Sequence, residues 1–101
     1  MIFFNIHERG GRKVIAICDE ELVGMELSHG KIRIDLKRYS GFYTDGAKKI
    51  NGDEDLKEIL DSASSINAIG EKALSFLKKN GYDISGAKKV GEIPYIMIFR
   101  I

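Results

Sequence analysis

Two consecutive glycines near the N-terminus separate two apolar segments of similar length, and this pattern constrains the fold more than any other. Residues 2–8 alternate with the two-residue period of a strand, and residues 13–18 return as an almost wholly apolar run. Gly10-Gly11 tolerates the positive φ angles that a tight hairpin requires. Because a strand that is apolar on both faces is covered on both sides, we expect the second strand of this hairpin to lie inside a sheet.

Three further segments predict strands. Residues 31–36 alternate between apolar and charged side chains, which is typical of a strand with one face in the core and the other in water. Residues 87–90 form a shorter candidate. The segment 95–101 is apolar on both faces until Arg100, and Pro94 before it removes no interior hydrogen bond of a sheet. We therefore expect this last strand to lie in the interior of the sheet, covered on both faces.

The apolar spacing becomes helical in the second half of the chain. It predicts a helix over residues 53–63 and a longer one over residues 66–80, which Asn80-Gly81 ends as a left-handed stop. Asp19 is expected to cap a short helix or turn over residues 20–23. Together these elements predict an α+β domain, with a mostly antiparallel four- to five-stranded sheet and the helical pair packed on one face.

Length and composition restrict the classes of protein that this chain can represent. With 101 residues the chain has the size of a single domain, and 44% hydrophobic and 31% charged residues are typical of a globular one. The single cysteine excludes an internal disulfide and the paired thiols of a structural zinc site, so we expect a reducing, cytoplasmic location. We expect no signal peptide and no membrane partner, since no apolar run approaches about 20 residues.

The segment 37–52 mixes cations with aromatic rings in what we interpret as a long loop. Phosphates meet cations, and bases stack on rings, in proteins that bind single-stranded RNA. The net charge of +1 gives no global attraction to nucleic acid, so RNA or a ribonucleoprotein would have to be recognised locally. Alternatively, the rings are inward anchors and the lysines are simply solvated. The candidate contact residues are Lys37, Arg38, Tyr39, Phe42, Tyr43, Lys48 and Lys49.

A second candidate group surrounds a glycine inside the longest predicted helix. Glycine there costs about 0.5–1 kcal/mol relative to alanine, so Gly70 should allow either close packing or room for a ligand. Asn67 and Glu71 are four residues apart and share one face near the helix start, where free N–H groups suit an anion or a nucleotide edge. The structural alternative is that Gly70 lets another element approach while the two polar side chains satisfy a loop.

Cys18 is the only candidate nucleophile that the sequence places at a special position. It precedes a predicted helix start, which can lower the pKa of a thiol, and His7 lies on the neighbouring strand of the hairpin. The alternative is that Cys18 is a small buried apolar residue, and the acidic pair Glu20-Glu21 disfavours a thiolate. His7 and His29 lack the spacing of metal ligands, so we predict no catalytic residue, no metal and no cofactor.

Three segments together resemble a known family. They are residues 18–24, which read Cys-Asp-Glu-Glu-Leu-Val-Gly, residues 67–71, which read Asn-Ala-Ile-Gly-Glu, and residues 93–101, which run from Ile-Pro-Tyr to Phe-Arg-Ile. In this order and spacing they resemble the archaeal family labelled domain of unknown function 424, over essentially the whole chain. The resemblance implies a small cytoplasmic archaeal protein without an assigned activity, in an RNA-linked setting. Where the family often carries histidine and glutamine, this chain has Tyr95 and Met97.

Three functions remain open at this point. The first is a non-enzymatic module that binds RNA or a ribonucleoprotein through the basic aromatic loop. The second is a small enzyme or ligand-binding domain in which Asn67, Glu71, Cys18 and Asp19 share a pocket. The third is a structural subunit that self-associates through its aromatic residues. The sequence leaves the oligomeric state open.

Overall fold

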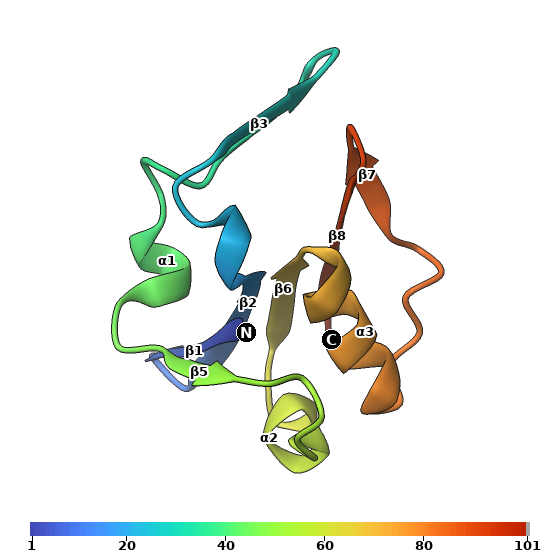
Figure 1. The fold of residues 1–101 in the computed structure, drawn as a ribbon. Helices are drawn as coiled ribbons and strands as arrows, with labels where there is room; N and C mark the ends of the chain where they lie inside the picture. Colours follow the sequence, from blue (N-terminus) through green and yellow to red (C-terminus); the bar gives the residue numbers. More distant parts are fainter. Residues whose placement is uncertain (101) are drawn as a thin grey trace.

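The chain folds around a six-stranded mixed sheet, which the computed structural model describes over residues 1–100 (Figure 1). In spatial order the strands are β5 (Lys48–Ile50), β1 (Ile2–Arg9), β2 (Arg12–Asp19), β6 (Ser65–Ile69), β8 (Ile93–Phe99) and β7 (Lys88–Val90). A separate hairpin consists of β3 (Glu26–His29) and β4 (Ile32–Asp35). The helices are the 3-10 turn η1 (Glu20–Leu22), α1 (Gly41–Thr44), α2 (Lys57–Asp61) and α3 (Glu71–Lys79). No helix within residues 1–100 has both the length and the apolar character needed to cross a membrane.

The N-terminal hairpin is confirmed in place and in register. β1 and β2 pair antiparallel from Ile2 opposite Asp19 to Arg9 opposite Arg12, so that Gly10-Gly11 is the two-residue turn. Both glycines have positive φ, 58° and 79°, as the favoured hairpin turn requires. β2 lies between β1 and β6, and its residues are buried from Ile15 onward, as its unbroken apolar run indicates.

The expected mostly antiparallel sheet of four to five strands is right in class and approximate in the number of strands. The sheet has six strands, and the β2–β6 pair is parallel whereas the other pairs are antiparallel. The predicted strand 31–36 exists as β4, but it pairs only with β3. Its alternation correctly predicts one buried face, because Ile34 packs with Leu27 and Leu36 against Ile69 of the large sheet. The β3–β4 hairpin therefore packs onto the face of the large sheet and is not part of it.

The predicted helix over residues 66–80 is wrong in its first third. Residues 65–69 form β6, and only Glu71–Lys79 is helical. In β6 Ile66 and Ala68 face the helical side of the sheet while Ile69 faces the other, so apolar residues on both faces of one strand mimic a helical stripe. The chain changes direction between β6 and α3 at Gly70, which has φ of 112°. The expected stop at Asn80-Gly81 is confirmed, since Asn80 is the C-cap and Gly81 has φ of 88°.

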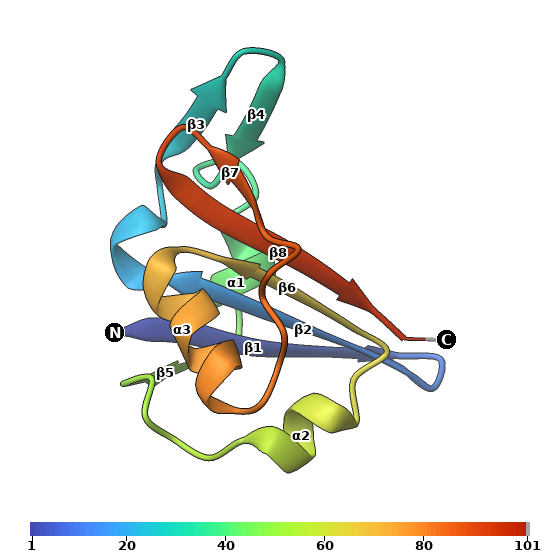
Figure 2. The same cartoon turned by 90° about the vertical axis from the view of Figure 1, so that its right-hand side faces the viewer.

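The two longer helices pack on one face of the sheet, as expected for the helical pair, although α2 covers only Lys57–Asp61 of the predicted 53–63. In Figure 2, α3 lies in front of the strands and α1 lies behind them. Leu60 and Leu77 are fully buried in the core between helices and sheet. Phe76 of α3 meets Phe4 of β1 edge-to-face, with ring centroids 6.0 Å apart.

The buried side-chain amide of Asn80 connects the segment before α2 to the end of α3. The Oδ1 atom of Asn80 accepts a hydrogen bond of 2.9 Å from the backbone N–H of Leu56, just before α2. Its Nδ2 atom donates to the carbonyl oxygens of Phe76, at 3.0 Å, and of Glu54, at 3.3 Å. Asn80 is only 5% exposed, and it therefore fixes the irregular segment that leads into α2.

The final strand is interior to the sheet, as expected, but it is not covered on both faces. β8 lies between β6 and β7, and Ile96 faces the helical core. On the other face Met97 is 55% and Phe99 is 69% exposed, because no element covers that half of the sheet. Ile101, the last residue of the expected strand, lies outside the described residues.

A surface cluster beside α2 gives the protein an expected sensitivity to acid. Asp61 accepts hydrogen bonds from the hydroxyl of Tyr82 and from Lys57 Nζ, the latter at 2.9 Å, and Arg100 lies 3.4 Å away. The hydrogen bond from Tyr82, followed by that from Lys57, lowers the pKa of Asp61 from 3.8 to about 2.

A carboxylate with a lowered pKa stabilises the folded state above its ordinary pKa and loses that contribution as the pH falls. We therefore expect the unfolding free energy to drop between pH 3.8 and about 2, and to drop less in Asp61→Asn. Urea titrations of both proteins at several pH values measure this difference. Parallel pH profiles for the two proteins would contradict the assignment.

Candidate functional site

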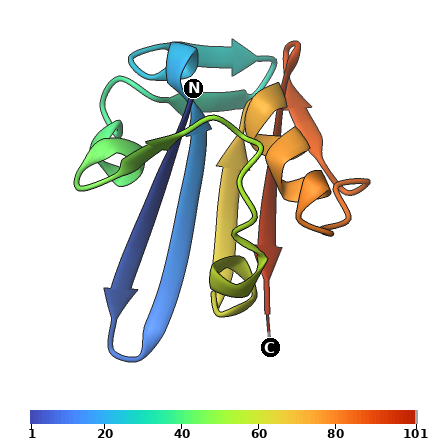
Figure 3. The same ribbon diagram turned by 60° about the horizontal axis from the view of Figure 1, so that its bottom comes forward.

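The face of the sheet opposite α2 and α3 is only half covered. The β3–β4 hairpin and α1 lie at one end of the long strands, whereas the turn of the β1–β2 hairpin projects at the other end (Figure 3). A second core cluster, with Cys18, Leu22 and Ile69 among its members, fills the covered end. Asn5, Ala16, Asn67 and Met97 stand opposite one another on β1, β2, β6 and β8. Asn5 and Ala16 are buried, whereas Asn67 is partly buried and Met97 is exposed at the uncovered end. We call this uncovered half the open sheet face.

Two polar residues of β1 hold α1 at the edge of the open sheet face. The Nδ2 atom of Asn5 donates to the carbonyl oxygens of Phe42, at 3.1 Å, and Asp45, at 2.9 Å. His7 Nε2 lies 2.6 Å from the same Phe42 oxygen, so it must carry the hydrogen, because a carbonyl only accepts. The imidazole also stacks on the Phe42 ring with centroids 4.8 Å apart and planes 4° from parallel. These contacts fix the ring of Phe42 although it is 37% exposed.

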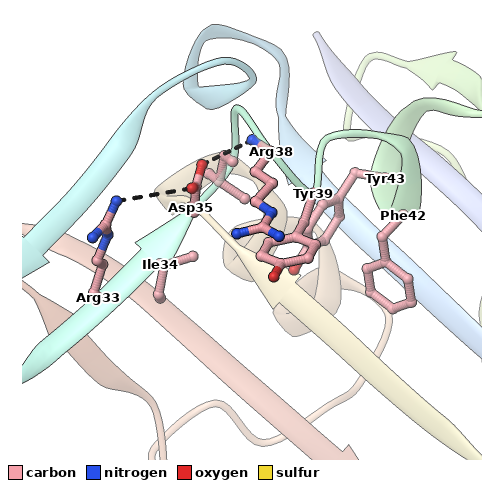
Figure 4. Close-up of a pocket in the computed structure, with 8 residues that line it drawn as sticks. Arg33, Ile34, Asp35, Arg38, Tyr39, Phe42 and Tyr43 are labelled. Carbon is pink, nitrogen blue, oxygen red and sulfur yellow. Dashed lines mark hydrogen bonds and ion pairs between the residues drawn. The ribbon is translucent and has the colours of Figure 1, made fainter.

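A groove of about 660 Å³ opens between α1 and the hairpin (Figure 4). Figure 4 shows Ile34 and the rings of Phe42 and Tyr43 projecting from opposite sides, over the strands beyond. We call this cavity the aromatic groove. Its lining residues are Arg33, Ile34, Asp35, Leu36, Arg38, Tyr39, Phe42 and Tyr43.

The cations of the aromatic groove differ in their pairing. Arg33 lies 3.5 Å from Glu26 and 4.0 Å from Asp35, whereas the guanidinium of Arg38 lies over the ring of Tyr39, 5.5 Å from its centroid. None of the ion pairs within residues 1–100 involves Arg38 or Lys37. Asp35 instead accepts the backbone N–H groups of Arg38 and Lys37, at 2.8 and 3.1 Å, and these bonds lower its pKa. The groove therefore keeps unpaired positive charge beside exposed rings.

A second cavity of about 340 Å³ adjoins the aromatic groove and shares Arg33, Ile34 and Tyr43 with it. Its other lining residues are Ile32 of β4 and residues of β6 and β8, among them Asn67, Tyr95 and Met97. Tyr43 lies at the boundary of the two cavities, and burial raises the pKa of its phenol to about 12. It is therefore a neutral hydrogen-bonding group at neutral pH. We call this second cavity the amide pocket, after Asn67.

The structure brings some of the predicted contact residues together and separates others. Arg38, Tyr39, Phe42 and Tyr43 all line the aromatic groove, and Lys37 directly precedes them on the exposed turn. Lys48 and Lys49 instead lie on the edge strand β5, where Lys49 Nζ is 2.6 Å from Glu20 and lies over the ring of Phe3. The two lysines do not line the groove.

Asp19 and Gly70 form a structural junction. The Asp19 carboxylate accepts the backbone N–H groups of Ala73, at 2.7 Å, and Lys72, at 3.1 Å, and so caps α3 from the end of β2. A Cβ atom on Gly70 would lie 2.5 Å from both carboxylate oxygens, which explains the glycine. Burial raises the pKa of Asp19, while the two N–H groups oppose the shift. The structural alternative for Gly70, close approach of another element, is the one that the geometry supports.

The thiol of Cys18 is buried and protonated at neutral pH. Burial, followed by the nearby charges of Asp19 and Glu21, raises its pKa to about 12, and Sγ donates to the carbonyl oxygen of Asp19 at 3.3 Å. Cys18 stands opposite Phe3 in the hairpin whereas His7 stands opposite Val14, so the two residues are four positions apart and form no pair.

Asn67 and Glu71 do not share a site. Asn67 lies on β6 and lines the amide pocket, whereas Glu71 begins α3 and lines a shallow depression on the other side of the sheet, together with Lys72 and Lys79. The pocket expected to combine Asn67, Glu71, Cys18 and Asp19 is therefore not formed by these four residues. Among residues 1–100, no group of three or more His, Cys, Asp or Glu side chains is arranged to hold a metal ion.

Arg33, Ile34, Tyr95 and Met97 line the two cavities but were not among the candidate contact residues. The alternation of β4 predicts that Arg33 lies on the outward face of the strand. It does not show that this face lies beside a cavity. Tyr95 and Met97 were noted only as departures from a family pattern. Their exposure depends on which elements cover β8, which is a property of the assembled fold.

The chain is similar to a solved structure, described as an uncharacterized conserved protein from Methanopyrus kandleri, with a TM-score of 0.81 and 26% sequence identity, covering 97% of this chain and 90% of that one. No curated protein is significantly similar to the chain. The model of the family described as protein of unknown function (DUF424) matches residues 7–101. With nearly its whole length matched, the chain belongs to the DUF424 family.

Proposed function

We propose that the protein is a non-enzymatic module that binds single-stranded RNA, free or within a ribonucleoprotein, through the aromatic groove. The observation that carries the proposal is the arrangement of exposed rings beside unpaired cations. Tyr39 is 59% exposed, and the guanidinium of Arg38 lies over its ring. Phe42 lines the same groove, and its ring is stacked on the imidazole of His7. Such an arrangement suits a strand whose bases stack on the rings while its phosphates meet the cations.

The open sheet face supplies the room that a single strand needs. The groove leads through the shared residue Tyr43 into the amide pocket and onto Met97 and Phe99 of β8. A duplex would present its phosphates and not the faces of its bases, so exposed rings favour unpaired RNA. The cytoplasm expected for a chain with one free thiol is a compartment where such RNA is present.

The proposal is tested by fluorescence anisotropy with a labelled single-stranded RNA of about ten nucleotides. We expect binding at micromolar protein that weakens with salt, with a slope of log affinity against log salt of about −1.4, since each phosphate contact contributes about −0.7 and two cations at the groove, Lys37 and Arg38, form no ion pair within residues 1–100. A hairpin RNA of the same length should bind more weakly. Absence of binding at low salt, or affinity that does not change with salt, would rule the proposal out.

Tyr39→Ala is expected to weaken RNA binding about 5- to 150-fold, because stacking on an aromatic side chain contributes about 1–3 kcal/mol per base. Tyr39 is largely exposed and its ring contacts Arg38, so the variant should retain the wild-type melting temperature. The same anisotropy titration measures the effect.

A pair of charge variants separates the groove from the rest of the surface. Arg38→Gln should weaken binding and make the salt slope less negative by about 0.7. Lys78→Gln removes one positive charge from α3, on the opposite side of the sheet, and should leave both quantities unchanged. Equal effects of the two variants would show that binding follows net charge and not the groove.

A further inference from the structure

Asn67 differs from the other two asparagines whose side chains lie in or against the sheet and helices. Asn5 donates two hydrogen bonds to carbonyl oxygens, and Asn80 makes three hydrogen bonds. The side chain of Asn67 makes none with the residues that the structure describes, although it is partly buried on an interior strand. Asparagine is depleted in strands. No buried side-chain nitrogen or oxygen within residues 1–100 lacks a partner, so the amide of Asn67 is accessible to solvent in the pocket. An amide of this kind in a cavity floor is available to a ligand.

The amide pocket has the form of a site for a flat molecule with a polar edge. Its volume of about 340 Å³ lies at the lower end of the range of ligand cavities. The walls are apolar or aromatic, from Ile34, Tyr43, Tyr95 and Met97, and Asn67 provides a donor and an acceptor side by side. Arg33 reaches the same cavity, but its guanidinium is engaged by Glu26 and Asp35 at the rim. Hydrogen-bond recognition in this cavity therefore depends on the amide.

A single strand in the aromatic groove would pass directly over this pocket. The two cavities share Arg33, Ile34 and Tyr43, so a base stacked near Phe42 and a base turned into the pocket can belong to neighbouring nucleotides of one chain. Unpaired bases of RNA are read in this way, splayed out and hydrogen-bonded on their edges.

We propose that Asn67 reads one nucleobase of the bound RNA, with a preference for adenine. This inference rests on the proposed function of the groove. Adenine offers a donor next to an acceptor on two edges, N6 with N7 and N6 with N1, so an amide can pair bidentately with either. Uracil also pairs with an amide on two edges, but the larger purine ring buries more surface against the tyrosines and Met97. Guanine presents two acceptors on its N7 edge and so offers only its Watson–Crick edge, O6 with N1–H, and cytosine likewise offers one suitable edge.

The test uses four labelled single-stranded RNAs of nine nucleotides, all uridine except for a central A, C, G or U. For the wild-type protein we expect the RNA with the central adenosine to bind tightest, about tenfold tighter than the RNA with the central guanosine, a purine of similar size whose N7 edge cannot pair with the amide. In Asn67→Leu, which keeps the size and removes the amide, the adenosine and guanosine RNAs should bind equally, because their purine rings fill the pocket to a similar extent.

Two further variants keep the result interpretable. Asn67→Asp has the same shape and only accepts hydrogen bonds, so it should fold as the wild type does and lose the preference for adenine. Asn51→Leu makes the matched replacement at an exposed asparagine outside both cavities and should keep the preference. Wild-type binding without base preference, or a preference for adenosine over guanosine that survives in Asn67→Leu, overturns this inference and leaves the groove proposal intact. Absence of any RNA binding overturns both.

Discussion

Replacement of Gly70 by alanine is expected to lower the free energy of unfolding by about 2–6 kcal/mol. Two costs add at this position. With φ of 112° and ψ of 153°, the backbone lies in a region that is essentially restricted to glycine, which contributes about 1–3 kcal/mol. The new Cβ would also lie 2.5 Å from both oxygens of the Asp19 carboxylate, and overpacking contributes about 1–3 kcal/mol more. Urea denaturation of wild type and variant measures the sum.

The chain offers a matched control for this substitution. Gly86 lies in the loop before β7 without positive φ, and a Cβ there would meet no atom within 4 Å, so Gly86→Ala should change stability by less than about 0.5 kcal/mol. The clash with Asp19 predicts coupling as well. In Asp19→Ala the carboxylate is gone, so Gly70→Ala should cost less in that background than in the wild type. Strict additivity of the two changes would show that they do not meet.

The same glycine shows where reasoning from the sequence succeeds and where it stops. Gly70 is identifiable as unusual because glycine is costly inside a helix, and close packing is a correct explanation for it. The element around it is not identifiable, because Ile66, Ile69 and Ala73 satisfy a helical period even though Ile66 and Ile69 face opposite sides of a strand. Only the pairing of β6 with β8 and with β2, whose paired residues lie 51 positions apart in the chain, decides in favour of the strand.

The N-terminal hairpin could be predicted in full because everything that specifies it is local. Gly10-Gly11 sets the turn, and the turn sets the register from Arg9 opposite Arg12 to Ile2 opposite Asp19. The position of β4 could not be predicted in this way, because its apolar face indicates that something covers it without indicating what. A single sequence does not show which distant segments of the chain pair or pack together.

The same distinction between local and non-local information applies to the candidate site. The segment from Arg38 to Tyr43 could be identified because cations and rings are adjacent in the sequence, and it lines the aromatic groove. Lys48 and Lys49 are close in sequence but lie on an edge strand, so proximity along the chain was misleading there. Asn67 was selected for its relation to Glu71, yet its neighbours in space are Tyr43, Tyr95 and Met97. Each of these contacts depends on the strand order.

Asn80→Asp is expected to cost about 3–4 kcal/mol of unfolding free energy, although it changes neither the size nor the shape of the side chain. Nδ2 of Asn80 donates to the carbonyl oxygens of Phe76 and Glu54, and a carboxylate would place a negative oxygen against both. Because the site is 5% exposed, water cannot replace the lost partners, and an unpaired buried charge costs several kcal/mol.

The loss of unfolding free energy in Asn80→Asp should depend on pH in a defined direction. A carboxylate at this position has a raised pKa in the folded state, since burial and the two carbonyl oxygens disfavour its charge. Its protonated form can donate one hydrogen bond, so the cost should shrink below about pH 4 and grow as the pH rises through the raised pKa. Asn67→Asp provides the matched control, because the Asn67 amide makes no hydrogen bond within residues 1–100 and loses no protein partner. Comparable destabilisation by the two variants at pH 7 would contradict the structural role of Asn80, because the same chemical change would then act independently of the hydrogen bonds that join the segment before α2 to the end of α3.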